Sequence, residues 1–349
     1  MVTVFIEQDI FNDIIIYNDD YPNWRKILTG HAEICLNITE DNLKAEEVPG
    51  TEIFEFIHSL GGKKINAVSE YIEDIKVNNA LLLDWPRGVF FLNLPKDKAD
   101  ELQKEYGIIV QSNEEINDIL LTGSFKRKLL KDETIENGPV SGWKELLKFK
   151  FPPSNSIVIS DNYLLPTVER VGAQFVKLGK MNLIWLLDAI LPNQISVPYH
   201  IAIISEDDNK NELWRNTLAG DIKTEISSLR NYEIKVEVIF VKSENFHERI
   251  LMMNYINSSC EHGFCVFKSR DGKTVHMVNK LQINSYFSSI DNNQGESEYE
   301  VASKDLKLIK NECTSLAAHI NSGVPVYRGA ILGDCNADKS INNRLLNDV

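Results

Sequence analysis

This chain of 349 residues has little cysteine, no long apolar run and no excess of basic residues. Its five cysteines form neither a close CxxC pair nor a regular disulfide framework, which favours a reducing compartment. No apolar run approaches the roughly 20 residues of a membrane-spanning helix. Lys and Arg number 37 against 51 Asp and Glu, a formal net charge of −14. We therefore expect a cytoplasmic protein with no transmembrane segment that does not bind nucleic acid or anionic membranes by bulk attraction.

The remaining composition is that of an ordinary globular protein. Hydrophobic residues make up 43% of the chain and charged residues 25%, and the length is natural for two domains. Cys260, His262 and Cys265 are spaced closely enough to suggest a metal site, but no fourth ligand accompanies them. Free thiols in a loop and a strand are the simpler interpretation.

In the first third of the chain, short apolar runs alternate with helix-like segments. We expect strands at residues 2–6, 79–83, 89–92 and 108–110, separated by helices, and this order predicts an α/β fold with a mostly parallel sheet. Active sites of such sheets lie at the carboxyl ends of the strands. Glu7, Asp9, Asp84 and Asn93 fall at those predicted ends.

A change in composition suggests where the domains divide. Between residues 126 and 153 the chain becomes basic and then contains Pro152 and Pro153. We expect a first domain at 1–130, a linker at 131–154, a second domain at 155–335 with a C-terminal helix, and a poorly ordered tail at 336–349. A solvated helical connector is the alternative for the linker.

The second domain contains the motif His247-x-Arg249-x-x-x-x-Asn254. It follows an alternating polar and apolar run at 232–241 that predicts a half-buried strand. If residues 250–253 form the next strand, His247 and Arg249 lie two residues apart and share one face. A guanidinium beside an imidazole can hold a phosphate, because the planar fork matches two phosphate oxygens.

This motif resembles the HxKxxxxD signature of the phospholipase D superfamily, with Arg for Lys and Asn for Asp. It is most similar to the phospholipase D-like domain at the C-terminus of MIT-domain proteins, which act with the ESCRT machinery. Residues 157–163, 182–187 and 263–268 resemble that domain's opening strand, first long helix and glycine-plus-aromatic strand.

The resemblance implies a phospholipase D-like α/β fold in which His247 is catalytic and Arg249 and Asn254 bind phosphate. Catalysis in the superfamily uses two histidines from two motifs, and this chain has one, so the resemblance implies a homodimer. The MIT-associated relatives are regarded as phosphate or lipid binders. Retained phosphate binding, phosphodiester cleavage and a structural role therefore remain three alternatives for His247 and Arg249.

Residues 6–11 resemble the opening of a PIN-like nuclease domain, and residues 89–115 resemble its end. The resemblance implies a three-layer domain in which Glu7 and Asp9 are catalytic and bind Mg²⁺ or Mn²⁺ together with Asp84. Asn93 stands where the family has an acid, and Asp97 is a candidate substitute. The middle acid of the family could be Glu40, Asp41 or Glu46. The alternative is that Glu7, Asp9 and Asp13 supply the negative charge that the first turn of a helix favours, in a degenerate PIN-like domain or an unrelated α/β domain.

Both resemblances point to phosphate chemistry. We expect a metal-dependent nuclease effector of a bacterial phage-defence or toxin system, whose second domain binds phosphate and dimerises. Its partner would be single-stranded nucleic acid or a phosphorylated ligand. The alternative is a non-catalytic adaptor or sensor, in which two degenerate nuclease-like domains bind a partner protein or a phosphorylated ligand.

Overall fold

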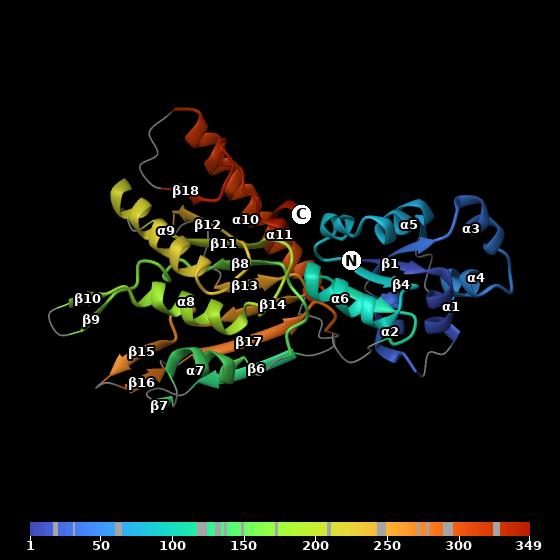
Figure 1. Cartoon of the computed structure of the whole chain (residues 1–349), viewed down its shortest axis with the longest axis horizontal. Coiled ribbons are helices and arrows are strands. Elements are labelled where there is room, and N and C mark those ends of the chain that lie inside the picture. Colours follow the sequence, from blue (N-terminus) through green and yellow to red (C-terminus); the bar gives the residue numbers. More distant parts are fainter. Residues whose placement is uncertain are drawn as a thin grey trace.

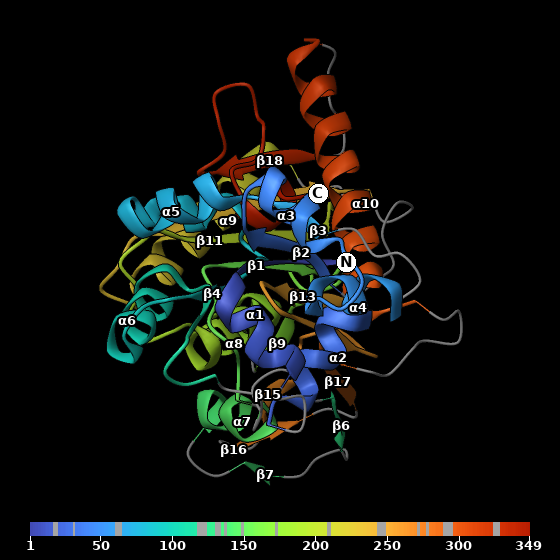
Figure 2. The ribbon, with the colours of Figure 1, turned by 90° about the vertical axis from the view of Figure 1, so that its right-hand side faces the viewer.

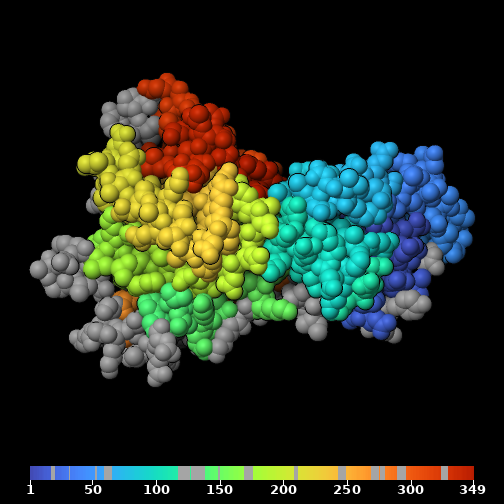
Figure 3. All heavy atoms as spheres, viewed as in Figure 1, coloured from blue at the N-terminus to red at the C-terminus, as the bar shows by residue number. Residues whose placement is uncertain are grey.

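Two β-sheets organise the computed structural model, which describes residues 1–16, 20–30, 32–59, 65–116, 124–129, 134–135, 138–147, 150–171, 174–207, 211–242, 249–270, 273–276, 279–288, 296–323 and 329–349. We call them sheet A and sheet B, and we call the parts built around them unit A and unit B. The units form two lobes that meet at a narrower waist (Figure 3).

Sheet A is entirely parallel, with the strand order β3-β2-β1-β4-β5. Its strands are β1 (Val2–Glu7), β2 (Ala32–Asn37), β3 (Ile65–Ala67), β4 (Val89–Leu92) and β5 (Ile109–Ser112). All four residues of β4 are buried, as expected for a strand that is covered on both faces. From β1 the chain adds β2 and β3 to one edge of the sheet, and then returns to add β4 and β5 on the other side of β1. The strand order therefore reverses between β1 and β4, which is the topological switch point of the sheet.

Helices cover both faces of sheet A. One core contains residues of α1 (Gln8–Ile16), α2 (Pro22–Gly30), α3 (Glu40–Glu46) and α4 (Glu52–Ser59). The other contains residues of α5 (Ser69–Val77), of the 3₁₀ helix η1 (Asn79–Asp84) and of α6 (Lys96–Tyr106). The α/β class and the mostly parallel sheet are therefore confirmed, and unit A has three layers (Figure 2).

The strand expected at residues 79–83 is wrong, because this segment forms η1. Leu82 is fully buried in the core between α5, α6 and sheet A, and Asn79 donates from Nδ2 to the carbonyl of Ile75 at 2.8 Å. A short apolar run does not by itself distinguish a buried strand from a buried turn of helix. As a result, Asp84 precedes β4 and does not follow a strand.

Sheet B has eight strands in the order β18-β12-β11-β8-β13-β14-β17-β6. They are β6 (Ser124–Leu129), β8 (Ser156–Ser160), β11 (Tyr199–Glu206), β12 (Ile234–Val241), β13 (Ile250–Met253), β14 (Ile256–Cys260), β17 (Asn279–Ser285) and β18 (Ala330–Gly333). β8, β11 and β12 run parallel, and the other pairings are antiparallel. The core on one face contains residues of α7 (Gly138–Leu146), α8 (Leu178–Ile190) and α9 (Glu212–Ser227), whereas α10 (Glu298–Asn321) and α11 (Arg344–Asn347) contribute to the core on the other.

Two smaller elements complete unit B. The strands β9 (Glu169–Val171) and β10 (Gln174–Val176) pair as a hairpin. A separate three-stranded sheet contains β7 (Thr134–Ile135), β15 (Phe267–Arg270) and β16 (Lys273–His276).

The expected end of the first domain, the linker and the tail need correction. β6 lies inside the expected first domain at 1–130 but pairs with β17 of unit B. α7 lies inside the expected linker at 131–154 and packs its buried Trp143 into the core of unit B beside α8. The tail is also packed, because α11 buries Leu345 and Leu346 completely or almost so. Both segments are basic or polar on average, but each contains a few large apolar side chains that are buried against elements distant in the sequence. Average composition therefore gave the wrong prediction.

The two units meet at the amino ends of their parallel strands (Figure 1). The hydroxyl of Tyr255 in unit B accepts from the backbone N–H of Ile109 at 2.9 Å and donates to the carbonyl of Gly88 at 2.6 Å. Asn155, just before β8, donates from Nδ2 to the carbonyl of Tyr106 at 2.8 Å. The carboxyl ends of β1 and β8 consequently face away from each other, toward opposite ends of the molecule.

Candidate functional site

Glu7 lies at the carboxyl end of β1, on the switch point of sheet A. The residue is 5% exposed, and its carboxylate accepts three hydrogen bonds. Oε1 accepts from Lys76 Nζ at 2.9 Å and from the backbone N–H of Asn93 at 3.2 Å, and Oε2 accepts from Asn37 Nδ2 at 2.8 Å. The site that a metal ion would need is therefore occupied by an ammonium group and two N–H donors.

Lys76 is held by two acids, which fixes its charge at this position. Its Nζ lies 2.9 Å from Glu7 and 2.6 Å from Glu73. Burial alone would lower the pKa of Lys76, but the hydrogen bonds to Glu73 and Glu7 outweigh that effect and raise it. The pKa of Glu73 is lowered by its hydrogen bonds from Lys76 and Asn37. Lys76 is thus the centre of a small network in which it forms ion pairs with both Glu7 and Glu73.

The other two predicted metal ligands do not join Glu7. Asp9 is exposed in the first turn of α1, and Asp84 is exposed ahead of β4, at the opposite end of the sheet from Glu7. No group of three or more His, Cys, Asp or Glu able to hold a metal ion occurs in the part of the chain that the structure describes. The residues expected to bind Mg²⁺ or Mn²⁺ do not fit that role.

The second predicted site lies at the carboxyl end of β8, where Arg249 precedes β13. Nη1 of Arg249 donates to the carbonyl of Glu261 at 2.7 Å, and its guanidinium carbon lies 5.3 Å from the centre of the Tyr163 ring. No ion pair between Arg249 and a carboxylate occurs among the described residues, and Nε has no hydrogen-bond partner there. His247 lies outside the described residues.

Asp161 is buried and close enough to Arg249 to feel its charge. Its Oδ1 accepts from the N–H of Tyr163 at 3.0 Å, and its Oδ2 accepts from the N–H of Phe264 at 2.7 Å. Burial raises the pKa of Asp161, although these N–H groups and the charge of Arg249 oppose the shift. Gly263 has a φ of +85°, and a Cβ there would lie 2.5 Å from Oδ2 of Asp161. The glycine that carried part of the sequence resemblance is thus required by this close approach.

Asn254 has a structural role that leaves no polar atom of its side chain for phosphate. It is 0% exposed and lies at the waist. Oδ1 accepts from the N–H groups of Asn155 and Ser156 at 3.0 and 3.2 Å, and Nδ2 donates to the carbonyl of Pro86 at 2.6 Å and to Oδ1 of Asn155 at 3.0 Å. The predicted phosphate-binding role of Asn254 therefore needs correction, because three of its four hydrogen bonds stay within unit B and the fourth reaches Pro86 of unit A.

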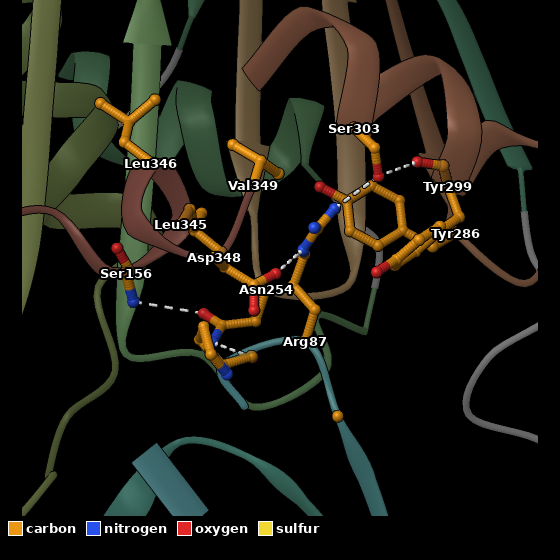
Figure 4. A network of polar contacts seen from close by, with 12 residues as sticks. Arg87, Ser156, Asn254, Tyr286, Tyr299, Ser303, Leu345, Leu346, Asp348 and Val349 are labelled. Atoms are coloured by element: carbon orange, nitrogen blue, oxygen red, sulfur yellow. Dashed lines mark hydrogen bonds and ion pairs between the residues drawn. The ribbon is translucent and has the colours of Figure 1, made fainter. Parts of the chain in front are cut away.

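The waist also contains a buried ion pair that the sequence gave no reason to expect. Arg87 of unit A forms an ion pair with Asp348, donates to Ser303 Oγ at 2.7 Å, and lies 4.5 Å from the centre of the Tyr299 ring (Figure 4). Its side chain is 4% exposed. Residues 87 and 348 are 261 positions apart, so no spacing signal connects them.

Neither a protein-family model nor a curated protein matches this chain. Among solved structures, it is similar to TrmBL2, an archaeal chromatin protein described as showing a novel mode of DNA binding. The TM-score is 0.24 and the identity 12%, over 75% of this chain and 69% of that chain. A similarity of this size carries no argument about function.

The membrane prediction can be checked in part. In the part of the chain that the structure describes, no helix is long and apolar enough to cross a membrane.

Proposed function

We propose that this protein is a non-catalytic adaptor or sensor that binds a phosphorylated ligand through Arg249. The observation that carries this proposal is the set of contacts that the guanidinium of Arg249 makes. It lies on an aromatic ring at one end of the molecule and forms no ion pair with a described carboxylate, in a chain where acids outnumber bases. A planar guanidinium suits a phosphate, because its positive charge and its N–H groups match the phosphate oxygens.

The cluster around Glu7 supports the non-catalytic part of the proposal. A metal-dependent nuclease needs several carboxylates to share one divalent ion. Glu7 is instead neutralised by Lys76, and the two other acids expected at the site lie apart from it. Hydrolysis of a phosphodiester at this edge would first require the Glu7–Lys76 ion pair to open.

The distribution of charge supports the same conclusion. Residues 1–116 contain 22 Asp and Glu against 10 Lys and Arg, so they carry −12 of the formal net charge of −14. A surface with this excess of acid repels the phosphate backbone of RNA or DNA. Unit A is therefore better suited to a basic partner protein than to nucleic acid, whereas the anion would bind at the opposite end of the molecule. Two separate binding edges on one chain are what an adaptor requires.

The ligand site can be tested with inorganic pyrophosphate as the probe, measured by isothermal titration calorimetry. We expect saturable binding that weakens at least about tenfold in Arg249→Gln, the loss that follows when a charge-assisted contact of about 1.4 kcal/mol or more is removed. Arg25→Gln is the matched control, since Arg25 is also half-buried and donates to one backbone carbonyl, that of Ile15 at 3.3 Å. Equal weakening in both variants, or no saturable binding in the natural protein, would contradict the proposed site.

The nuclease hypothesis can be tested separately on single-stranded RNA with Mn²⁺. We expect no cleavage that depends on Glu7. Metal-dependent cleavage that is lost in Glu7→Gln would overturn the non-catalytic proposal and restore the PIN-like one. The homodimer implied by the phospholipase D resemblance stays a prediction, which gel filtration of the full chain would test.

A further inference from the structure

A cavity of about 360 Å³ lies between the second half of α10 and the C-terminal segment. Lys310, Ala317 and Asn321 line it from α10, at spacings of seven and four residues that place them on one side of the helix. The opposite wall includes Asp338 and Leu346. Pockets that bind small organic molecules have volumes of roughly 300–1,000 Å³. The cavity is therefore large enough for such a ligand.

The part of the cavity nearest the core is apolar. Ala317 and Leu346 are 7% and 1% exposed and belong to the core on the α10 face of sheet B, and Ile341 packs against that core. Ala318 adds a second small side chain at the same turn of α10. Larger residues at these two positions of α10 would fill the space, so the two alanines keep the cavity open. An apolar part of a ligand would lose contact with water here, which favours binding.

A hydrogen-bonded turn at residues 336–340 forms one end of the cavity. The N–H of Asn336 donates to the carbonyl of Ser340 at 3.0 Å. Lys339 has a φ of +62°, which is costly for a residue with a Cβ, and no other residue except glycine has a positive φ in the part of the chain that the structure describes. Oδ1 of Asp338 stabilises the turn by accepting from the N–H and the hydroxyl of Ser340 at 3.0 and 2.6 Å. The turn thus fixes the position of the Asp338 carboxylate in the cavity wall.

The side-chain amides in the cavity wall donate to protein carbonyls and leave acceptor oxygens. Nδ2 of Asn321 donates to the carbonyl of Asp338 at 2.6 Å, and Nδ2 of Asn347 donates to the carbonyl of Ile341 at 3.1 Å. Oδ2 of Asp338 and Oδ1 of Asn321 accept from no described residue. The hydrogen bonds from Ser340 lower the pKa of Asp338, so its carboxylate is charged at neutral pH. The wall around Asp338 therefore suits a ligand that donates hydrogen bonds and carries positive charge.

The lysine that lines the cavity lies at its other end. Lys310 precedes Asn321 by eleven residues, which is roughly 16 Å along the helix. Its Nζ donates to the carbonyl of Val349. Lys339 follows Asp338 in the sequence but is not among the residues that line the cavity. Within the cavity wall, a cation beside Asp338 would therefore meet a carboxylate and no neighbouring lysine.

We propose that this cavity binds a small organic cation with a primary ammonium group on an apolar chain. The ammonium group donates to Asp338 Oδ2 and Asn321 Oδ1, and its three N–H donors suit a wall of acceptors. The apolar chain lies along Ala317 and Leu346. An anion would be repelled by the Asp338 carboxylate, and a neutral chain of the same length would gain nothing from it.

This site is independent of the anion site proposed at Arg249. Ala317 and Leu346 belong to the core on the α10 face of sheet B. Phe264, whose N–H is bonded to Asp161 near Arg249, belongs to the core on the opposite face. The two proposals can therefore fail separately, and pyrophosphate binding at Arg249 does not bear on the cavity.

Isothermal titration calorimetry of the full chain at pH 7 tests the site with hexylammonium chloride as the probe. We expect saturable binding with a Kd of about 1 mM or lower, which is within reach of a ligand this small. Hexan-1-ol has the chain without the charge, and ammonium chloride has the charge without the chain, so each should bind at least about tenfold more weakly. Asp338→Asn should weaken hexylammonium binding at least about tenfold, because the asparagine oxygen can still accept from Ser340 but carries no charge. Asp97→Asn, at an exposed acid in the first turn of α6, is the matched control and should leave the affinity unchanged.

The place of binding is read from the methyl NMR signals of the alanines. Hexylammonium should shift the signals of Ala317 and Ala318, and Ala318→Leu, at an exposed position, should weaken binding at least about tenfold by filling the cavity. No saturable binding, equal affinity for hexan-1-ol, an unchanged affinity in Asp338→Asn, or methyl signals that shift elsewhere but not at Ala317 and Ala318 would overturn the proposal. The methyl measurement uses the natural protein, so it remains decisive if a variant does not fold.

Discussion

The buried ion pair at the waist predicts how strongly the two units depend on each other. Arg87 has three partners in unit B, which are the carboxylate of Asp348, the hydroxyl of Ser303 and the ring of Tyr299. Asp348→Asn removes the charge of Asp348 while keeping its size. The guanidinium would then remain buried with no carboxylate beside it.

The magnitude follows from the burial of this pair. Breaking a buried ion pair by neutralising one partner typically costs about 3–5 kcal/mol, because the remaining charge stays out of water. The ring of Tyr299 still contributes, since a cation over an aromatic face is worth roughly 0.5–2 kcal/mol. We therefore expect Asp348→Asn to lower the free energy of unfolding by about 3 kcal/mol. Arg87→Met should cost a similar amount, because it leaves Asp348 buried and unpaired.

The assay is equilibrium unfolding in urea, followed by circular dichroism and tryptophan fluorescence. The double variant, Arg87→Met with Asp348→Asn, contains no buried charge at this place and should be less destabilised than the sum of the single variants. Glu101→Gln is the surface control, because Glu101 and Lys98 form an exposed ion pair, and no measurable change is expected. The reasoning is refuted if Asp348→Asn unfolds within about 1 kcal/mol of the natural protein, or if the two single effects simply add.

Two further substitutions test the waist. Asn254→Ala should lower the free energy of unfolding by about 2–4 kcal/mol in the same urea assay, because it leaves buried N–H and C=O groups unpaired. Asn66→Ala, which removes an exposed contact, is its control, and similar losses in both would count against the bridging role of Asn254. Gly107→Ala should lower the melting temperature, because Gly107 has a φ of +64° and a Cβ there would lie 2.4 Å from the carbonyl oxygen of Ser154. Gly30→Ala meets nothing within 4 Å, so an equal effect at both glycines would show that close approach is not the cause.

Much of the fold could be predicted because the relevant signals are local. Thr39 caps α3 by accepting from the N–H of Asn42, as a threonine before acidic first-turn residues predicts. Gly107 ends α6 in the left-handed conformation, as expected for a glycine that follows a helix. The parallel sheet of unit A followed from alternation of buried strands with helices. Where the local signal was ambiguous, as at residues 79–83, the prediction was wrong.

The candidate sites were less predictable, because a residue type says what a side chain can do and not which partner it meets. Glu7 was correctly placed at the carboxyl end of β1, but the sequence did not show that Lys76, 69 positions later, neutralises it. Asn254 was identified by its spacing from Arg249. Only the structure shows that Asn254 is buried and donates to the carbonyl of Pro86, 168 positions earlier, and so lies at the waist.

The sequence by itself therefore determined the alternation of strands and helices, the acidic surface of residues 1–116, and the presence of Arg249 at the start of a strand. Those properties depend on neighbouring residues or on composition alone. The tertiary structure decided which charges are paired, buried or open. Arg87 forms an ion pair with Asp348, and Glu7 forms one with Lys76, whereas Arg249 forms no ion pair with a described carboxylate. The physical reason is that the energy of a charge depends on its distance to other charges and to water, and folding sets both across the whole chain.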